Sequence, residues 1–212
     1  WVDSESKHIV NTSNMLQLDA PSETAEAVIS TASTAAYGEW EVYIELGFNP
    51  SSSNLSRFYI ISDSQDVKGA VDGYFVQIGD TEDEVSLYRQ DGSSAIKIID
   101  GPDGLVDTNP VSIRIRVTRD LDGNWELLAD SLGGTSYNSL GTAADNTYTQ
   151  SEFIGLFSDY TSTRSKLFEY DDIQVTKINP PLDIQNVTVV DNQTFDVSFN
   201  LDVDPASVQA SD

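Results

Sequence analysis

Strict alternation of apolar and polar side chains is the feature of this sequence that most constrains its fold. Residues 38–48 (GEWEVYIELGF) and 111–118 (VSIRIRVT) alternate without a break. Because successive side chains of a β-strand point to opposite faces, both segments are predicted to be half-buried strands. The predicted inward side chains are Trp40, Val42, Ile44, Leu46, Val111, Ile113, Ile115 and Val117.

Nine further segments carry the same signal, and no stretch of the chain shows sustained helical periodicity. Short glycine-containing turns at 90–93 and 120–124 separate alternating runs, which predicts antiparallel hairpins. Without helices to cover a parallel sheet, the expected fold is all-β, a sandwich of two antiparallel sheets of the jelly-roll kind. The nine segments are 15–20, 27–32, 57–62, 73–79, 84–90, 95–100, 124–130, 151–157 and 166–175.

Two consecutive prolines, Pro180 and Pro181, predict a domain boundary because proline cannot donate to a strand ladder. Residues 1–178 are expected to form the jelly-roll domain. Residues 179–212 are expected to form a linker and the first strands of an Ig-like domain. Two alternating segments occur in this tail, and two strands alone are only marginally stable.

Charge and residue types exclude several functions. The chain has 35 Asp and Glu against 11 Lys and Arg, a formal net charge of −24, which disfavours nucleic acid and anionic membrane surfaces as partners. It has no Cys and one His, which argues against Cys-based zinc sites and a Ser-His-Asp triad. No apolar run approaches the roughly 18 residues of a membrane span, so no direct membrane insertion is expected.

Several segments together resemble the concanavalin A-like (LamG-type) jelly-roll domain of Bacteroidota secreted surface proteins. The tail at 194–208 is similar to the opening of bacterial Ig-like repeats. The resemblance implies export by the type IX route to the extracellular space or cell surface. It also implies downstream domains of the same protein and the secretion machinery as partners. The carrying segments are 49–63, 73–80, 85–92, 117–130, 145–157 and 168–175.

The spacing of acidic residues along the predicted strands argues against catalysis. Jelly-roll glucanases place three acids on one strand as E-x-D-x-x-E, because a retaining mechanism needs two carboxylates on one face. Residues 169–174 come closest, but Gln174 stands where the last acid is needed. Glu39, Glu41 and Glu45 share one strand face, but at spacings of two and four residues that differ from this pattern. An acidic strand face is usually only solvent-exposed surface. Two alternative functions remain for the chain: a glucanase-like glycoside hydrolase, and a structural cap that positions downstream domains without binding a ligand.

A non-catalytic carbohydrate-binding or adhesion module is the preferred interpretation, with a glycan or cell-surface polysaccharide as partner. Glycan recognition needs exposed aromatic rings beside hydrogen-bonding groups. Side chains of both kinds have outward parity and are expected to line one concave sheet; the alternative is that the tyrosines cap the core or pair across strands. The candidates are Tyr43, Tyr59, Phe75, Gln77, Tyr88, Arg114 and Arg116.

Calcium is the expected cofactor, because Ca²⁺ takes six to eight oxygen ligands and acidic loops supply them. The resemblance implies a structural calcium that joins the first strand to the last, at Asp171 or Asp172. A second acidic group, Asp63, Asp66 and Asp72, precedes the strand at 73–79 and forms a weaker candidate.

Overall fold

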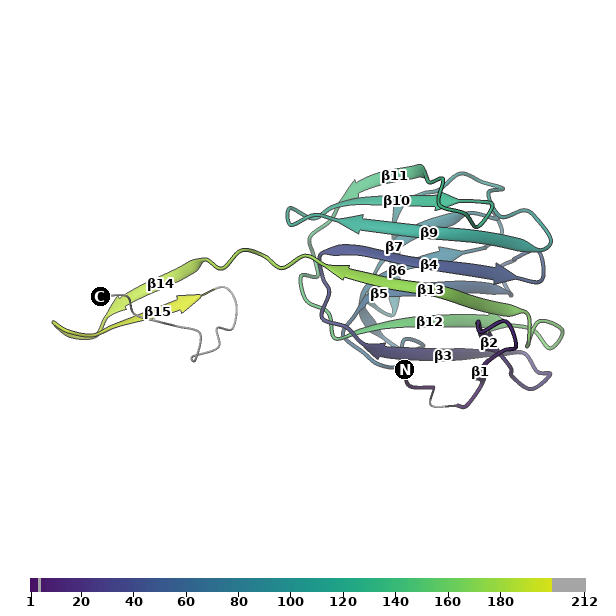
Figure 1. Cartoon of the computed structure of the whole chain (residues 1–212), viewed down its shortest axis with the longest axis horizontal. Coiled ribbons are helices and arrows are strands. Elements are labelled where there is room, and N and C mark those ends of the chain that lie inside the picture. The colour runs from purple at the N-terminus through teal and green to yellow at the C-terminus, as the bar shows by residue number, and fades with distance from the viewer. Residues whose placement is uncertain (4, 200–212) are drawn as a thin grey trace. The chain divides into compact units, whose positions relative to one another are not determined.

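The computed structural model of the chain describes residues 1–3 and 5–199, and these contain strands but no helix (Figure 1). The chain divides into two compact units, Trp1–Ile178 and Asn179–Asp212. No helix long and apolar enough to cross a membrane occurs among the described residues. Folding of each unit by itself stays a prediction.

The first unit contains a six-stranded and a seven-stranded sheet, and every pairing within them is antiparallel. The predicted all-β sandwich of two antiparallel sheets is therefore confirmed. In spatial order the six-stranded sheet consists of β3 (Ala25–Ala32), β12 (Phe153–Tyr160), β5 (Leu55–Ser62), β6 (Val71–Ile78), β7 (Val85–Gly92) and β8 (Ser94–Ile99).

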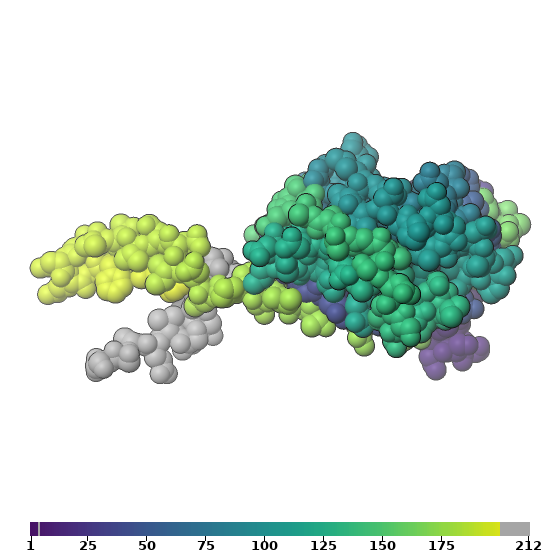
Figure 2. All heavy atoms as spheres, turned by 90° about the horizontal axis from the view of Figure 1, so that it is seen from above, coloured from purple at the N-terminus to yellow at the C-terminus, as the bar shows by residue number. Residues whose placement is uncertain are grey.

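The seven-stranded sheet packs against it, and the edge strands β8 and β11 contact each other at the side of the unit seen in Figure 2. In spatial order this sheet consists of β1 (His8–Val10), β2 (Leu16–Leu18), β13 (Phe168–Lys177), β4 (Gly38–Leu46), β9 (Val111–Arg119), β10 (Asn124–Asp130) and β11 (Asn138–Ala144).

One hydrophobic core fills the space between the inward faces of the two sheets. All eight apolar side chains that alternation assigns to the inward faces of residues 38–48 and 111–118 are buried. Trp40 of β4 and Trp125 of β10 stack there with ring centroids 6.0 Å apart. Burying a large apolar side chain contributes about 1.5–3 kcal/mol, so these faces hold the sheets together.

Two strands were not predicted, β1 and β11. Both lie at edges of the seven-stranded sheet. β11 reads NSLGTAA and has one large apolar residue, Leu140, so its sequence carries little alternation. It forms because the ladder of β10 offers a full row of unpaired backbone groups, which a polar strand can also satisfy.

Arg119, the last residue of β9, is buried among these strands at 1% exposure. It has no ion pair with any described carboxylate. Its guanidinium instead donates hydrogen bonds of 2.7–3.2 Å to three backbone carbonyls and one side-chain amide oxygen. The acceptors are the carbonyls of Ala36, Asp145 and Tyr148, and Asn146 Oδ1.

Aromatic rings surround the same guanidinium. Its central carbon lies 4.6 Å from the Trp125 ring, 4.7 Å from Tyr37 and 5.2 Å from Tyr74. Rings at these distances attract a cation through their electron-rich faces. Arg119 thereby ties the start of β4, the end of β9 and the loop between β11 and β12 into one packed corner.

We expect Arg119→Met to lower the free energy of unfolding by about 3 kcal/mol or more, because it leaves several buried oxygens without donors. Urea denaturation measures this loss. Arg164→Met is the control, since that guanidinium has one aromatic neighbour, Phe48, at 5.4 Å. Equal losses in the two variants would contradict the role assigned to Arg119.

The second unit contains β14 (Ile184–Val189) and β15 (Phe195–Phe199), which form an antiparallel hairpin. Most of its large apolar side chains are exposed, with Val189 at 74% and Phe195 at 65%, whereas Val197 and Phe199 are half-buried. The Ig-like continuation stays a prediction, and most of its carrying segment, residues 200–208, lies outside the described residues.

Limited proteolysis of the chain with a nonspecific protease should cut first within residues 178–183. Residues 178–183 belong to no strand, whereas β1–β13 are held in the sandwich. Mass spectrometry of the fragments identifies the cut. First cuts within residues 1–170 would argue against independent folding of the first unit.

Candidate functional site

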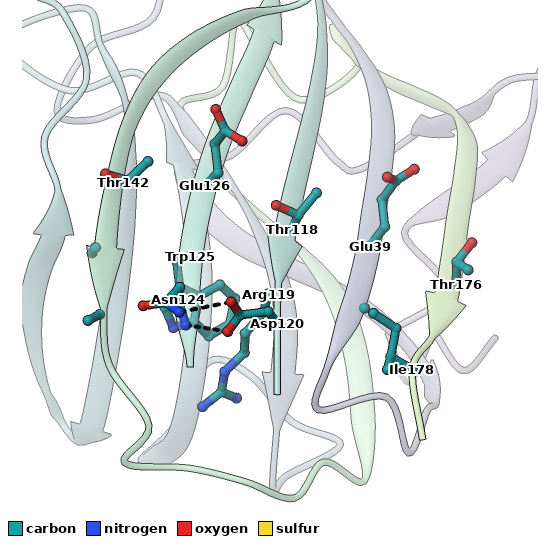
Figure 3. Close-up of a pocket in the computed structure, with 13 residues that line it drawn as sticks. Glu39, Thr118, Arg119, Asp120, Asn124, Trp125, Glu126, Thr142, Thr176 and Ile178 are labelled. Atoms are coloured by element: carbon teal, nitrogen blue, oxygen red, sulfur yellow. Dashed lines mark hydrogen bonds between the residues drawn. The ribbon is translucent and has the colours of Figure 1, made fainter. Parts of the chain in front are cut away.

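Five polar side chains form a row across the outward face of the seven-stranded sheet (Figure 3). They come from the neighbouring strands β13, β4, β9, β10 and β11, and each lies opposite the next in the strand register. Neighbouring strands are about 4.8 Å apart, so a hydroxyl or a carboxylate occurs at every step. This Thr–Glu row consists of Thr176, Glu39, Thr118, Glu126 and Thr142.

Alternation directs these side chains outward. Glu39 precedes the buried Trp40, and Glu126 follows the buried Trp125. Thr118 lies next to Arg119, whose side chain turns inward. The tryptophans and Arg119 thus anchor the inner side of the strands that present the row.

Gly38 begins β4 opposite Lys177 of β13. Its φ is +135°, and a Cβ there would lie 1.9 Å from the carbonyl oxygen of Thr176. A larger residue would push β13 away from β4. Glycine therefore keeps Thr176 next to Glu39 in the row.

An open groove of about 820 Å³ lies over the row. Ile178, Ala143 and Ala144 add apolar surface, and the turn from Asp120 to Asn124 borders it. Asn124 Nδ2 donates to Asp120 Oδ2 over 2.8 Å, which holds this turn (Figure 3). Hydroxyls donate and accept whereas carboxylates only accept, so the lining suits a ligand rich in hydroxyl groups.

The other half of the same face is covered by residues 131–137, the loop between β10 and β11. A Cβ on Gly133 would lie 2.6 Å from both the Tyr43 ring and Ser112 Oγ. The Tyr137 ring lies 4.2 Å from the Arg116 guanidinium. The groove therefore occupies the half that the loop leaves open.

Ion pairs lie along the covered half, and one reaches the row, where Arg116 Nε is 3.4 Å from Glu39 Oε1. Glu41 Oε1 is 3.1 Å from Arg114 Nη1, and Glu41 Oε2 is 2.8 Å from Arg116 Nη2. Burial favours the neutral acid, but the Tyr137 hydroxyl and the two guanidinium groups hold the pKa of Glu41 below its usual range. Burial and the same carboxylate raise the pKa of Tyr137 to about 12. Arg114 and Arg116 are thus already paired within the sheet.

The predicted glycan-contacting residues lie on two sheets, which corrects the expectation of one shared face. Tyr43, Arg114 and Arg116 belong to the seven-stranded sheet. Period-two alternation tells which face of its own strand a residue occupies, but it does not tell which sheet the strand joins. The candidates on the six-stranded sheet are Tyr59, Phe75, Gln77 and Tyr88.

Those four residues lie on the outward face of their sheet, but two of the rings are buried. Tyr59 and Phe75 are each 1% exposed, and they form a second apolar cluster apart from the main core. The Arg57 guanidinium lies 4.9 Å from Phe75 and donates to Gln77 Oε1 over 3.0 Å. Tyr88 stacks on Phe75 at 5.1 Å and is half-buried. These rings pair across strands, as the alternative interpretation expected.

Asp171 and Asp172 lie at an irregularity in the pairing of β13 with β4. Asp172 Oδ2 is 2.6 Å from Arg114 Nη2, and Asp171 Oδ1 accepts the amide of Asp172. Because a guanidinium already neutralises Asp172, this pair does not fit the donor set of a calcium site. Calcium binding by the chain stays a prediction.

Asp63 and Asp72 line a second pocket of about 320 Å³, whereas Asp66 lines a different one. Asp63 Oδ1 accepts the amide of Asp72, and Asp72 Oδ1 accepts the amide of Gly92. The structure therefore brings together two of the three predicted acids and separates the third.

Tyr148 also lines the second pocket, next to a network of charged groups. Its hydroxyl donates to Asp91 Oδ1 over 2.7 Å, and Arg89 pairs with both Asp91 and Asp145. Burial favours the neutral form of Asp145, but hydrogen bonds lower its pKa to about 2, and the bond from Tyr74 contributes most to this lowering. Arg89 and the two aspartates thus hold the loop that carries Tyr148.

Three carboxylates close enough to hold one cation lie elsewhere, at Glu82, Glu84 and Asp103. Glu84 is 2% exposed, and Lys97 Nζ lies 2.5 Å from its Oε1 and 2.6 Å from Asp100 Oδ1. The Lys97 ammonium therefore balances one of the three negative charges of this cluster, that of the buried Glu84. The run of acidic residues at 82–84 was its sequence signal, but Asp103 comes from the distant β8–β9 loop.

No protein-family model matches the sequence, and no curated protein matches it. Solved structures do resemble it. The carbohydrate binding module CBM66 from Bacillus subtilis has 13% identity and a TM-score of 0.56, over 82% of this chain and 92% of that chain. The exoplasmic/lumenal domain of VIP36, in its Ca²⁺/Man2-bound form, has 12% identity and a TM-score of 0.59, over 92% and 88%.

The legume lectin-like domain from Entamoeba histolytica is also similar, with 10% identity and a TM-score of 0.56, over 81% of this chain and 87% of that chain. At these identities the likeness shows the fold. The predicted concanavalin A-like jelly roll is confirmed. The Bacteroidota origin and the type IX route stay predictions.

Lys97→Met should lower the free energy of unfolding by about 1–3 kcal/mol, because the buried Glu84 carboxylate loses its cation. Adding Glu84→Gln should restore part of the loss. Lys166→Met is the matched control, since its pair with Asp19 is largely exposed and exposed pairs contribute little. Urea titrations that give equal losses for Lys97→Met and Lys166→Met would refute this.

Proposed function

We propose that the chain is a non-catalytic carbohydrate-binding module that holds a neutral glycan in the groove over the Thr–Glu row. The observation that carries the proposal is the open groove of about 820 Å³ with five hydroxyl or carboxylate side chains in register on its floor. The one aromatic residue in the lining, Trp125, is buried, so recognition in this groove rests on hydrogen-bonding groups held on a rigid support, and a packed sheet is such a support.

Charge supports a neutral ligand. Glu39, Glu126 and Asp120 line the groove, and the whole chain has a net charge of −24. Anionic ligands such as phosphates and sulfated glycans are repelled by such a surface. Sugar hydroxyls donate hydrogen bonds to carboxylates, and bonds to charged acceptors are the stronger kind.

The similar solved structures support the same class of ligand. One is titled a carbohydrate binding module, and VIP36 appears in a Ca²⁺/mannose-bound and a Ca²⁺/Man3GlcNAc-bound form. Calcium in this chain would need a donor set other than Asp172, which Arg114 holds.

An extracellular location is part of the proposal. The acidic surface and the resemblance to Bacteroidota surface proteins support an adhesive module of a multidomain protein exported by the type IX route. The second unit then connects the module to downstream domains. A cell-surface polysaccharide is the partner that this location favours.

Glycoside hydrolysis is a second candidate, favoured by one observation. Glu39 and Glu126 flank Thr118 in the groove, two strand spacings or about 10 Å apart at the backbone. Inverting enzymes place two carboxyl groups roughly 6.5–9.5 Å apart. The glucanase-like string at 169–174 lacks its last acid at Gln174 and does not add to this case.

A glycan array with the full chain tests the proposal. We expect binding to neutral oligosaccharides that falls at least tenfold in Glu126→Gln and in Thr118→Val, because each loses a hydrogen bond that the ligand cannot replace. Glu152→Gln, in the second pocket, is the matched control and should bind as the unchanged chain does.

Three outcomes would contradict the proposal, the first by moving the site and the other two by changing the function. Loss of binding in Glu152→Gln alone assigns the glycan to the second pocket. Absence of binding to any glycan favours a structural cap. Release of new reducing ends that stops in Glu126→Gln identifies a hydrolase.

A further inference from the structure

The spacing of the Thr–Glu row carries information about the shape of the ligand. The row crosses five strands at right angles to their direction and spans about 19 Å from β13 to β11. Each step of about 4.8 Å is close to the advance of one sugar in an extended β-linked chain. An extended glycan laid along the row therefore meets a new strand at each sugar.

The order of side chains has a period of two strands. Hydroxyls at Thr176, Thr118 and Thr142 alternate with carboxylates at Glu39 and Glu126 (Figure 3). In an extended β-1,4-linked chain, consecutive pyranoses face opposite ways, so the chain also repeats every second sugar. The row and the chain thus share a repeat of about 10 Å.

The two kinds of side chain suit the two orientations. A carboxylate accepts hydrogen bonds and cannot donate, so it selects sugar edges that present hydroxyl donors. A threonine hydroxyl donates and accepts, so it also tolerates ring and glycosidic oxygens. Glu126 has no ion pair among residues 1–3 and 5–199, and its carboxylate is half-buried in the groove.

The groove is open along the row. Thr142 and Thr176 at its two ends are exposed, whereas Glu39, Thr118 and Glu126 between them are half-buried. An exposed end lets a chain continue beyond the row in both directions. A pocket for a terminal sugar would instead be closed at one end.

We propose that the groove binds the interior of an extended, β-linked neutral polysaccharide, with one sugar on each of the five strands. This inference rests on the proposed carbohydrate-binding function and adds the class of chain and its direction across the sheet.

Four ladders of β-1,4-linked oligosaccharides, built from glucose, mannose, xylose or N-acetylglucosamine with two to six sugars each, test this by calorimetry on the full chain. We expect at least one ladder to bind, with affinity rising roughly threefold to tenfold per added sugar up to five and then levelling off. Maltopentaose, an α-linked coil, should bind at least tenfold more weakly than the best β-linked pentamer.

Thr142→Ala supplies the second readout, because β11 is the last strand of the row. It should weaken binding of the pentamer but leave the trimer unchanged, since three sugars fit on the other four strands. Thr118→Val, at the centre, should weaken both. Thr163→Ala, an exposed threonine away from the groove, is the control.

Equal affinity for dimer and pentamer, or equal weakening of trimer and pentamer by Thr142→Ala, overturns the inference and leaves carbohydrate binding in place. The inference is also overturned if the glycans that bind on the array include no β-1,4-linked oligosaccharide. Failure of every glycan on the array overturns the proposed function as well.

Discussion

The buried guanidinium of Arg119 is the interaction on which the arrangement of this sandwich most depends. Its four acceptors come from the segment before β4 and from the loop between β11 and β12, which are far apart in the sequence. Three aromatic rings enclose it. The buried carbonyls need hydrogen-bond donors, so the segments that carry them pack together only when the guanidinium lies between them. Both the groove and the second pocket border this packed corner.

The outward face of the seven-stranded sheet is divided by one loop. Residues 131–137 fold over Tyr43 and Arg116. Beneath the loop, Arg116 forms an ion pair with Glu41 of the neighbouring strand. Beyond the loop, Thr118 and Glu126 have no such cover and line the groove. The division makes one half a structural layer and leaves the other half available to a ligand. It also explains why outward arginines in an alternating strand need not contact a partner molecule.

Alternation predicted the two sheets and the inward side chains, because burial of one strand face leaves a period-two signature in the residues. It did not predict β11, whose polar edge strand has no such signature, nor the sheet to which each strand belongs. Tyr43 and Tyr59 therefore share a parity but lie on opposite sides of the sandwich. The Thr–Glu row depends on register between five strands. Turns between consecutive strands help to set the register of β9, β10 and β11, but β4 pairs with β9 and β13 across long stretches of chain, and no local pattern predicts those partners.

An amide NMR titration of the full chain with the tightest-binding oligosaccharide tests the central claim most directly, because it locates the ligand on the molecule. The account predicts that shifts gather on β4, β9, β10, β11 and β13 around Thr118 and Glu126. Shifts that gather instead around Asp72 and Tyr148, or around Tyr88 on the six-stranded sheet, with the row unchanged, would contradict it.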